Sequence, residues 1–407
     1  MSIPQTNRRQ FLGGAAAAAT WTILKPSLVR GSEANSKVAY GLVGCGGRGC
    51  WIAELFKQHG GYQLAATHDY FAEKANQAGD KHQVPAENRF DKLSGYKKLL
   101  ETKLDAIVIE SPPFFHPEQA AAGVDAGKHV FVAKPIAVDV PGCQSIGESG
   151  RQASQRKLAF LIDFQTRADP FYQEALKRVH AGALGRFVFG ESTYHAGIPW
   201  PAHAILLAKA PDNPETRLAA WGLDRVLSGD IITEQNIHTL DVMNWIMQKP
   251  PRRAWGTCGK SGREDPGTCN DHFVLTYDYG DGVAVAFSSR QFDGHGTQPE
   301  GIRNRMFGAD GVLETQYGGN VMIRGKNVYR GGKSPNIYRD GAAANIARFH
   351  QQITEGPLEN ATVEPSVQST LITIMGRTAA YTGNVVTWDQ TLASTEKLDG
   401  RLEGLKA

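Results

Sequence analysis

One stretch near the start of the chain, KVAYGLVGCGGRGCWIAELF at residues 37–56, constrains the fold more than any other. Apolar residues run into three glycines, Gly44, Gly46 and Gly49, which have the spacing G-x-G-x-x-G. Beyond them, apolar residues recur at the spacing of one helix face. The glycines therefore join a predicted strand to a predicted helix, and the unpaired N–H groups at the start of such a helix can bind a pyrophosphate.

A carboxylate that binds the ribose is expected about 20 residues further on, at the end of the next strand. Asp69, in the stretch YQLAATHDY, stands at that place. Its carboxylate would accept hydrogen bonds from a ribose 2′-OH and repel a 2′-phosphate, so we expect NAD rather than NADP. The predicted cofactor-binding residues of this region are Gly44, Gly46, Gly47, Arg48, Gly49 and Asp69. The alternative is a glycine-rich loop without a ligand, in which Asp69 caps the following helix.

The first 36 residues have a different character. Arg8 and Arg9 precede Phe11, Leu12 and an alanine-rich apolar run. This pattern is typical of a twin-arginine export signal and predicts a periplasmic or secreted protein. The run is too short for a good membrane span, and no later segment is long enough, so we expect no stable span in the mature chain. A plain N-terminal helix or a retained anchor is the alternative.

Length and composition set further bounds. A chain of 407 residues is too long for one ordinary hydrophobic core, so two domains are expected. The formal net charge is only +3 and no run of Lys or Arg stands out, which argues against a nucleic-acid partner. The five cysteines include no C-x-x-C pair, which argues against a zinc site or a disulfide framework. Free thiols are expected, with a pair between Cys258 and Cys269 as the alternative in an oxidising compartment.

Strand and helix patterns divide the chain at about residue 165. Residues 37–165 alternate short apolar strands with helices, which predicts a doubly wound parallel sheet. Residues 166–407 contain hairpin signals at Gly280–Gly282 and Ala309–Gly311, which predict a mainly antiparallel sheet. A proline-rich segment at 197–228 is expected to be irregular, and one continuous helix is expected at about 231–248. The predicted fold class is therefore α/β, followed by an α+β part.

Three segments offer chemistry near the carboxyl ends of the predicted strands. They are SPPFFHP at 111–117, Ala133-Lys134-Pro135, and the predicted helix GDIITEQNIHTLDVMNW. On that helix Glu234, His238 and Asp241 have the spacing i, i+4 and i+7, so they are expected to share one face. No H-E-x-x-H motif is present, so no metal site is predicted.

Lys134 and His238 are the residues expected to carry proton chemistry. A lysine beside a cofactor can have its pKa lowered by desolvation and by the positive nicotinamide, and can then bond to a substrate hydroxyl. His238 is a candidate general base, oriented by Glu234 or Asp241. The alternatives are a surface lysine before a proline and a buried histidine bonded to its carboxylate neighbours.

Taken together, the glycine loop, the S-P-P-x-x-H segment, the Lys-Pro pair and the H-x-x-D motif resemble the Gfo/Idh/MocA family of NAD(P)-dependent oxidoreductases. The resemblance implies an N-terminal Rossmann domain and a C-terminal domain whose open sheet often pairs subunits, hence a homodimer or homotetramer. It implies catalytic roles for Lys134, Glu234 and His238. Two departures stand out: Ala133 replaces the usual glutamate before the lysine, and Glu234 stands where aspartate is usual. The further residues implied at the site are Ser111, Pro112, His116 and Lys134 for the cofactor, and Arg167, Tyr194 and Asp241 for the substrate.

Three functions remain open from the sequence. The first is hydride transfer between tightly bound NAD and a secondary hydroxyl of a sugar, glycoside or cyclitol. The second is a redox-neutral glycoside hydrolase that uses NAD and acts through a 3-keto intermediate, which the export signal favours because free NAD is expected to be scarce outside the cytoplasm. The third is a dinucleotide-binding sensor without catalytic activity.

Overall fold

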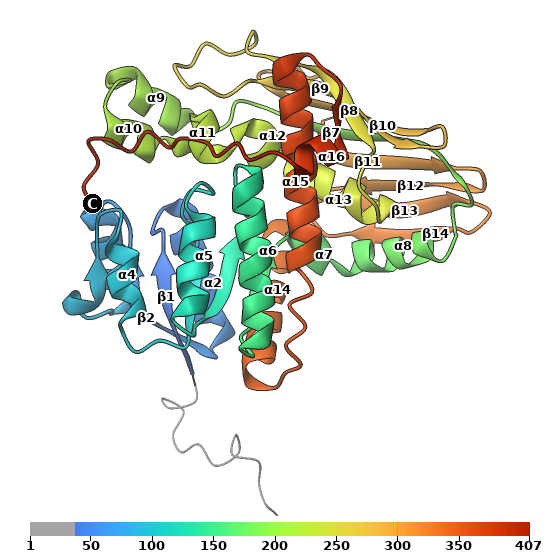
Figure 1. Cartoon of the computed structure of the whole chain (residues 1–407). Coiled ribbons are helices and arrows are strands. Elements are labelled where there is room, and N and C mark those ends of the chain that lie inside the picture. The colour runs from blue at the N-terminus through green and yellow to red at the C-terminus, as the bar shows by residue number, and fades with distance from the viewer. Residues whose placement is uncertain (1–36, 299) are drawn as a thin grey trace, which may run out of the picture. The chain divides into compact units, whose positions relative to one another are not determined.

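The computed structural model describes residues 37–298 and 300–407 of the chain. Two β-sheets, one parallel and one mainly antiparallel, lie side by side and carry helices on their faces (Figure 1). In this part of the chain no helix is both long and apolar enough to cross a membrane. The predicted export signal, residues 1–36, lies outside the described residues.

The first sheet has six parallel strands in the order β3-β2-β1-β4-β5-β6. Strands β4, β5 and β6 are short apolar runs that are almost entirely buried, as expected for a sheet with helices on both faces. The strand order reverses between β1 and β4, and ligands of such sheets bind beyond the carboxyl ends of the strands at that point. The strands are β1 (Val38–Val43), β2 (Tyr62–His68), β3 (Arg89–Phe90), β4 (Ala106–Ile109), β5 (His129–Ala133) and β6 (Phe160–Asp163).

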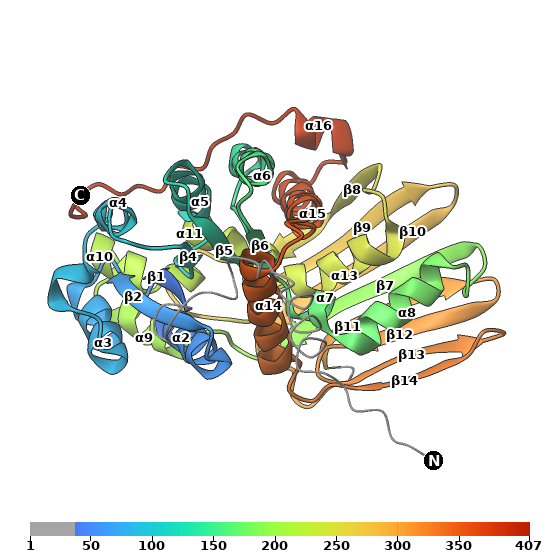
Figure 2. The ribbon, with the colours of Figure 1, turned by 90° about the horizontal axis from the view of Figure 1, so that it is seen from below.

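Helices from both ends of the chain cover this sheet. Helices α2 (Gly47–His59) and α14 (Ile337–Thr354) share a core with one face. Helices α5 (His116–Asp125), α6 (Val140–Gln155) and α15 (Val363–Thr382) share a core with the other. Figure 2 shows α14 beside β6, at the edge next to the second sheet. The other helices of this region are α3 (Ala72–His82), η3 (Ala86–Asn88) and α4 (Gly95–Leu100).

The second sheet has nine strands in the order β14-β13-β12-β11-β7-β10-β9-β8-β15. Every neighbouring pair is antiparallel except β7 and β10, which run parallel. Hairpins join β9 to β10 and β11 to β12 at the predicted turns, so the predicted fold class is confirmed. The strands are β7 (Phe187–Ala196), β8 (Arg253–Gly259), β9 (His272–Gly280), β10 (Val283–Gln291), β11 (Gly301–Gly308), β12 (Gly311–Gln316), β13 (Asn320–Gly325), β14 (Tyr329–Lys333) and β15 (Val386–Thr387).

Helix α15 belongs to the cores of both sheets. Leu371 and Ile374 pack into the core of the parallel sheet, whereas Ile372 and Met375 pack into the core of the nine-stranded sheet. Neither sheet therefore buries its apolar residues without this helix. The other helices near the second sheet are α7 (Gln165–Ala168), α8 (Pro170–His180), α13 (Ile237–Met247) and α16 (Trp388–Leu392).

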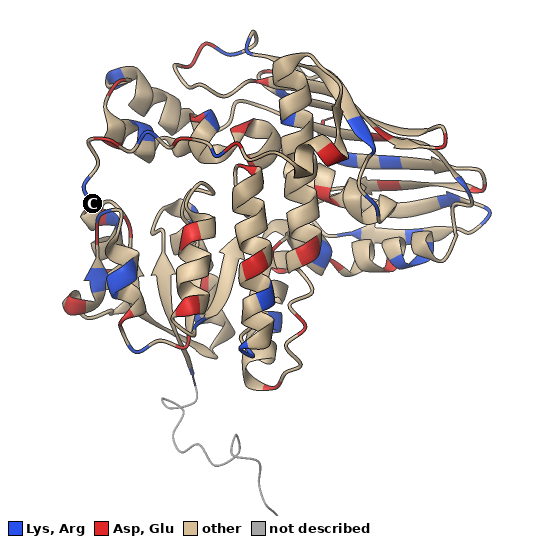
Figure 3. Ribbon diagram, in the orientation of Figure 1, with Lys and Arg blue, Asp and Glu red and all other residues tan. Residues whose placement is uncertain are grey.

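The opposite face of the nine-stranded sheet carries charged and aromatic side chains. Arg305 contacts Glu191 across neighbouring strands, and Arg324 lies 3.1 Å from Glu314. Bands of both charges run along these strands in Figure 3. Phe189 stacks on Phe307 with ring centroids 4.5 Å apart. This face is therefore mixed in character, with ion pairs around an aromatic pair.

Two predicted segments differ from the structure. The segment at 197–228 is not simply irregular, because it contains four short helices. The expected helix at 231–248 is broken into α12 (Asp230–Glu234) and α13, since the backbone N–H of Asn236 bonds to the carbonyl of Ile231 five residues earlier, at 2.8 Å. Such an insertion turns the helix. The four helices are α9 (Pro201–Lys209), α10 (Pro214–Ala219), η4 (Trp221–Leu223) and α11 (Arg225–Ser228).

Candidate active site

The glycine loop has an open side and a closely packed side. Gly44 has φ +94°, a conformation that favours glycine, and a Cβ on Gly49 would lie 1.9 Å from the carbonyl oxygen of Gly44. A Cβ on Gly46 would have nothing within 4 Å. Helix α2 begins at Gly47 without a side-chain cap and without an acidic residue in its first turn. Its first N–H groups are therefore available to an anion, and the loop fits the pyrophosphate of a dinucleotide.

Asp69 lies against this loop, directly after β2. Its Oδ2 accepts a hydrogen bond from the backbone N–H of Cys45 at 2.9 Å, and its Oδ1 accepts one from Phe71 at 3.0 Å. The carboxylate thus contacts both the loop and the entry to α3. A cavity opens beside it. Its lining includes Gly44, Gly46, Asp69, Tyr70, Lys74, Lys92, Leu93, Glu110, Ser111, Pro112 and Trp221.

Lys134 lies at the carboxyl end of β5 and is buried rather than on the surface. Its Nζ donates to the carbonyl oxygen of Glu234 at 2.6 Å and lies 3.1 Å from Oε1 of the same residue, and both side chains are 9% exposed. The other oxygen of Glu234 accepts from Gln235 at 2.6 Å, and Gln235 accepts from the hydroxyl of Tyr194 at 2.5 Å. This chain of contacts connects β5 of the first sheet to β7 of the second.

His238 lies in the first turn of α13 and is 7% exposed. Its Nδ1 has no hydrogen-bond partner, and its ring lies 5.4 Å from the ring of Tyr317. Burial, with the charges of Lys134 and Arg48, lowers the pKa of His238 well below its usual value, so the imidazole is neutral near pH 7. The expectation that Glu234 or Asp241 orients this histidine is wrong, because Glu234 bonds to Lys134 and Gln235, and Asp241 bonds to Arg167 and Ser369.

Asp241 is fully buried and is bonded to other groups. Its two oxygens accept from Nε of Arg167 at 2.9 and 3.0 Å, and one of them also accepts from the hydroxyl of Ser369 at 2.7 Å. The guanidinium of Arg167 lies 5.2 Å from the ring centroid of Trp245. Asp241 therefore fixes the orientation of Arg167. It does not share the contacts of Glu234 or His238, contrary to the expectation of one common face.

Arg48 contacts two carboxylates that the sequence analysis did not single out. Its Nη2 lies 2.5 Å from Asp163 and its Nε lies 3.1 Å from Glu110, while Nη1 donates to the hydroxyl of Tyr338 at 2.6 Å. Glu110 directly follows the buried strand β4, and Asp163 is the last residue of the buried strand β6. An acidic residue at the end of an apolar strand, as in AIVIE and FLID, is the signal that would have identified them.

His116 joins the two loops that follow β4 and β5. Its ring nitrogens lie 2.8 Å from the carbonyl oxygen of Pro135 and 2.7 Å from that of Ser111. Burial lowers the pKa of His116 to about 4. The side chain of His116, a predicted cofactor-binding residue, is thus bonded to backbone carbonyl groups. The hydroxyl of Ser111 donates to the side-chain oxygen of Gln119 at 2.5 Å. Both residues hold the loops that form one wall of the cavity.

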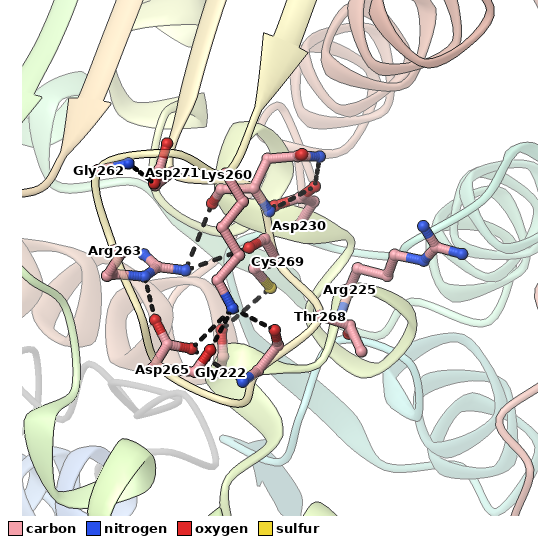
Figure 4. Close-up of polar contacts among 12 residues, drawn as sticks. Gly222, Arg225, Asp230, Lys260, Gly262, Arg263, Asp265, Thr268, Cys269 and Asp271 are labelled. Carbon is pink, nitrogen blue, oxygen red and sulfur yellow. Dashed lines mark hydrogen bonds and ion pairs between the residues drawn. The ribbon is translucent and has the colours of Figure 1, made fainter.

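The polar side chains of the loop at 260–271 bond to one another and to Asp230 of α12 (Figure 4). Nζ of Lys260 donates to the carbonyl oxygen of Asp265 at 2.5 Å, and Arg263 contacts the Asp265 carboxylate. The adjoining Asn270 bonds to Asp230, the first residue of α12, at 2.8 Å, and the backbone N–H of Thr268 bonds to Leu223 of η4 at 2.8 Å. The loop thereby anchors α12, which carries Glu234, and η4, which carries a residue of the cavity wall.

Two family models match the chain. The model described as "Oxidoreductase family, NAD-binding Rossmann fold" covers residues 38–159, and the one described as "GFO/IDH/MocA C-terminal domain" covers residues 172–314. The chain belongs to the GFO/IDH/MocA oxidoreductase family. A nicotinamide dinucleotide is the cofactor that this assignment indicates, in agreement with the glycine loop.

Individual relatives of this GFO/IDH/MocA chain are distant. It is 25% identical over 211 residues to inositol 2-dehydrogenase of Salmonella typhimurium (strain LT2). The aligned residues are 51% of this chain and 54% of the relative. The chain thus spans about half the length of such curated relatives. The solved aldose-aldose oxidoreductase of Caulobacter crescentus, complexed with glycerol, has a TM-score of 0.67 at 19% identity. A levoglucosan dehydrogenase solved with NADH and levoglucosan has a TM-score of 0.68 at 15% identity. Each covers 86% of this chain and 99% of its own, which confirms the fold.

Proposed function

We propose that this chain is an NAD-dependent oxidoreductase that moves hydride to or from a secondary hydroxyl of a sugar, glycoside or cyclitol. The observation that carries the proposal is the contact of Lys134 with Glu234 at the carboxyl edge of the parallel sheet, where ligands bind in such folds, together with the charge of Lys134 acting on the buried His238. The names of relatives, among them an inositol dehydrogenase, support the substrate class.

The roles proposed for the side chains follow from their charge and contacts. When bound, the cofactor supplies the hydride acceptor or donor. Lys134 donates a hydrogen bond to the reacting oxygen and stabilises negative charge on it, while Glu234 holds the ammonium in place. His238 is neutral, so it can accept the hydroxyl proton during oxidation and return it during reduction.

A polyhydroxylated substrate suits the polar atoms near His238. Its Nδ1 and the hydroxyl of Tyr317 are both buried and have no hydrogen-bond partner among the described residues. Buried polar atoms are seldom left unpaired, and each would gain a hydrogen bond from a sugar or cyclitol hydroxyl. Arg167 and Tyr194 are proposed to contact the same ligand at its rim.

The test is turnover with a panel of aldoses, glycosides and cyclitols. NADH formation is followed by absorbance, with polyols of equal size but without a ring as the control set. We expect saturable activity on at least one ring substrate, and loss of it in Lys134→Ala. If NADH binds but no panel member is turned over in either direction, the non-catalytic sensor becomes the better assignment.

A segment at the end of the described chain supports tight cofactor binding. This C-terminal strap, residues 396–407, runs alongside α10 to α12 in Figure 1. The backbone N–H of Lys406 donates to the hydroxyl of Tyr70 at 3.1 Å, and its carbonyl accepts from Leu93 at 3.1 Å. Tyr70 and Leu93 both line the cavity, and Nζ of Lys406 lies 3.3 Å from Glu215. The strap therefore ties together three segments around the cavity.

Tight retention favours a second candidate, the redox-neutral glycoside hydrolase. Oxidation of a sugar C3 hydroxyl acidifies the C2 proton, the glycosidic oxygen leaves by elimination, water adds, and the ketone is reduced again. The cycle returns the cofactor to its starting state. We expect a net oxidoreductase to require added NAD or a second sugar, whereas the hydrolase would release free sugar with its own bound cofactor and exchange the C2 proton with deuterium in D₂O.

The choice of cofactor, the export and the assembly are proposed as well. Asp69 favours NAD, although Lys74 and Lys92 line the same cavity and offer positive charge for a 2′-phosphate.

The paired arginines Arg8 and Arg9 are proposed to direct twin-arginine export, and their replacement by lysine should leave the protein in the cytoplasm. The open face of the nine-stranded sheet is proposed to pair subunits, which sedimentation can measure.

A further inference from the structure

Three charged side chains form one group beneath the glycine loop, and the reaction proposed above uses none of them directly. Glu110, Ala133 and Asp163 lie in one row at the carboxyl ends of β4, β5 and β6, since Ile109 pairs with Val132 and Ala133 pairs with Asp163. Neighbouring side chains in such a row point to the same face of a sheet. The guanidinium of Arg48 contacts the two acids, and the residue between them in the row is the small, uncharged Ala133.

Glu110 is the member of this group with the weakest hydrogen bonding. Its side chain is 0% exposed, yet neither carboxylate oxygen has a hydrogen-bond partner, and the 3.1 Å contact with Nε of Arg48 is not an aligned hydrogen bond. Asp163, by contrast, accepts from Asn345 at 2.8 Å and from Gln165 at 3.0 Å. The contact with Arg48 favours the ionised form of Glu110, whereas burial favours the protonated form.

The place of Glu110 connects it to the cofactor. Glu110 is among the residues that line the cavity of the glycine loop and Asp69, but its side chain is 0% exposed, so the carboxylate lies behind the cavity wall, next to Arg48. The charged groups that face it are Arg48 from α2, Asp163 from β6 and Lys134 from the end of β5. Burial and the charge of Asp163 raise the pKa of Glu110 to about 7, against the opposing charges of Arg48 and Lys134. Any further charge placed in this cavity will therefore change its protonation near neutral pH.

We propose that Glu110 is a proton-exchanging carboxylate of the cofactor site, ionised when the oxidised cofactor is bound and protonated when the reduced cofactor is bound. The proposal rests on the proposed function, because it requires that a nicotinamide dinucleotide occupies this cavity. The oxidised nicotinamide carries one positive charge that the reduced ring lacks, and a nearby positive charge favours a carboxylate over a carboxylic acid.

The proton balance of the reaction agrees with this role. Oxidation of a secondary alcohol transfers one hydride to the cofactor and sets free the hydroxyl proton. Loss of the ring's positive charge favours protonation of Glu110 in the same step, so that proton has an acceptor within the site. Reduction reverses both events, and Glu110 returns the proton. Glu110 is thus a proton store linked to cofactor charge, whereas His238 remains the group that contacts the hydroxyl.

The test compares proton exchange on binding NAD⁺ and NADH. Calorimetric titrations of the protein, stripped of endogenous nucleotide, are run at pH 7 in two buffers with different ionisation enthalpies. NAD⁺ and NADH carry the same pyrophosphate. The difference between their proton counts therefore reports the charge of the nicotinamide ring. Because the pKa of Glu110 lies near the working pH, we expect NAD⁺ binding to release about half a proton and NADH binding to take up about half a proton, a difference of about one proton. Glu110→Gln should abolish this difference, and Glu101→Gln, which changes an exposed glutamate at the carboxyl end of α4, should retain it.

Several outcomes would overturn the proposal. An equal proton count for both nucleotides in the wild type would do so, as would a difference that persists in Glu110→Gln. If that variant does not fold, the same titrations of the wild type at a series of pH values test the proposal. The difference in proton count between the two nucleotides must be largest near pH 7 and vanish towards pH 5 and pH 9. Failure of both nucleotides to bind would reject the proposed function, whereas binding without a differential proton count rejects the role of Glu110 alone.

Discussion

At the scale of single residues, the proposed site divides between groups that we expect to hold the cofactor and groups that we expect to handle the proton. Asp69 and the glycine loop belong to the first strands of the parallel sheet, whereas Lys134 follows β5 and His238 lies on α13. The two functions should therefore separate on mutation.

We expect Lys134→Ala and His238→Ala each to lower the rate of hydride transfer by about 10²–10⁴, the usual contribution of a positioned acid–base group. NADH affinity should change little. Because the pKa of His238 lies well below its usual value, its own titration should not appear in kcat/KM between about pH 6 and 8. Single-turnover absorbance measures transfer and fluorescence titration measures binding. Loss of NADH binding in both variants would show that these residues build the nucleotide site instead.

Asp69→Ser tests the choice of cofactor. Removal of the carboxylate takes away the ribose acceptor and the charge that repels a 2′-phosphate, while Lys74 and Lys92 remain in the cavity. The ratio of NADP to NAD affinity should rise. Asp80→Ser, on the exposed part of α3, is a matched control. An unchanged ratio would remove Asp69 from cofactor selection.

At the scale of elements, the glycine loop allows two substitutions with opposite expected effects. Gly49→Ala places a Cβ against the backbone of Gly44 and should lower the free energy of unfolding by about 1–3 kcal/mol, the usual cost of overpacking. Gly46→Ala meets no atom within 4 Å and should keep the fold, but its methyl group stands on the open side and should weaken NADH binding at least about tenfold. Urea unfolding measures the stability of each variant, and NADH titration measures its affinity for the cofactor. Equal stability of both variants would contradict the packing argument.

The elements also show what the sequence could and could not predict. Strand and glycine patterns located the parallel sheet, the hairpins and Lys134, because these depend on local periodicity and turn residues. The break between α12 and α13 depends on one backbone hydrogen bond at Asn236, and helix periodicity does not reveal it. For the same reason the expected carboxylate partner of His238 was wrong. Glu110 was missed because its contact with Arg48 joins residues from two separate strand–helix units.

At the scale of the whole molecule, the strap should control how fast the cofactor leaves. Deletion of residues 399–407 removes the contacts of Lys406 with Tyr70, Leu93 and Glu215. We expect NADH to dissociate about tenfold faster, with thermal unfolding little changed. Stopped-flow displacement measures the rate, and Tyr70→Phe, which removes one of these contacts, should give a smaller effect. Dissociation at the wild-type rate after the deletion would show that the strap has no part in retention.

The sharing of α15 by two cores has a consequence for the order of events during synthesis. The parallel sheet comes from the first part of the described chain, but its two faces are completed by α14 and α15, which are made last. A nascent chain that has passed residue 165 already contains all six strands, yet it still lacks α14 and α15, which complete the apolar cover on the two faces of the sheet. We therefore expect the parallel sheet to reach its full stability only when α14 and α15 have been made, after most of the second sheet.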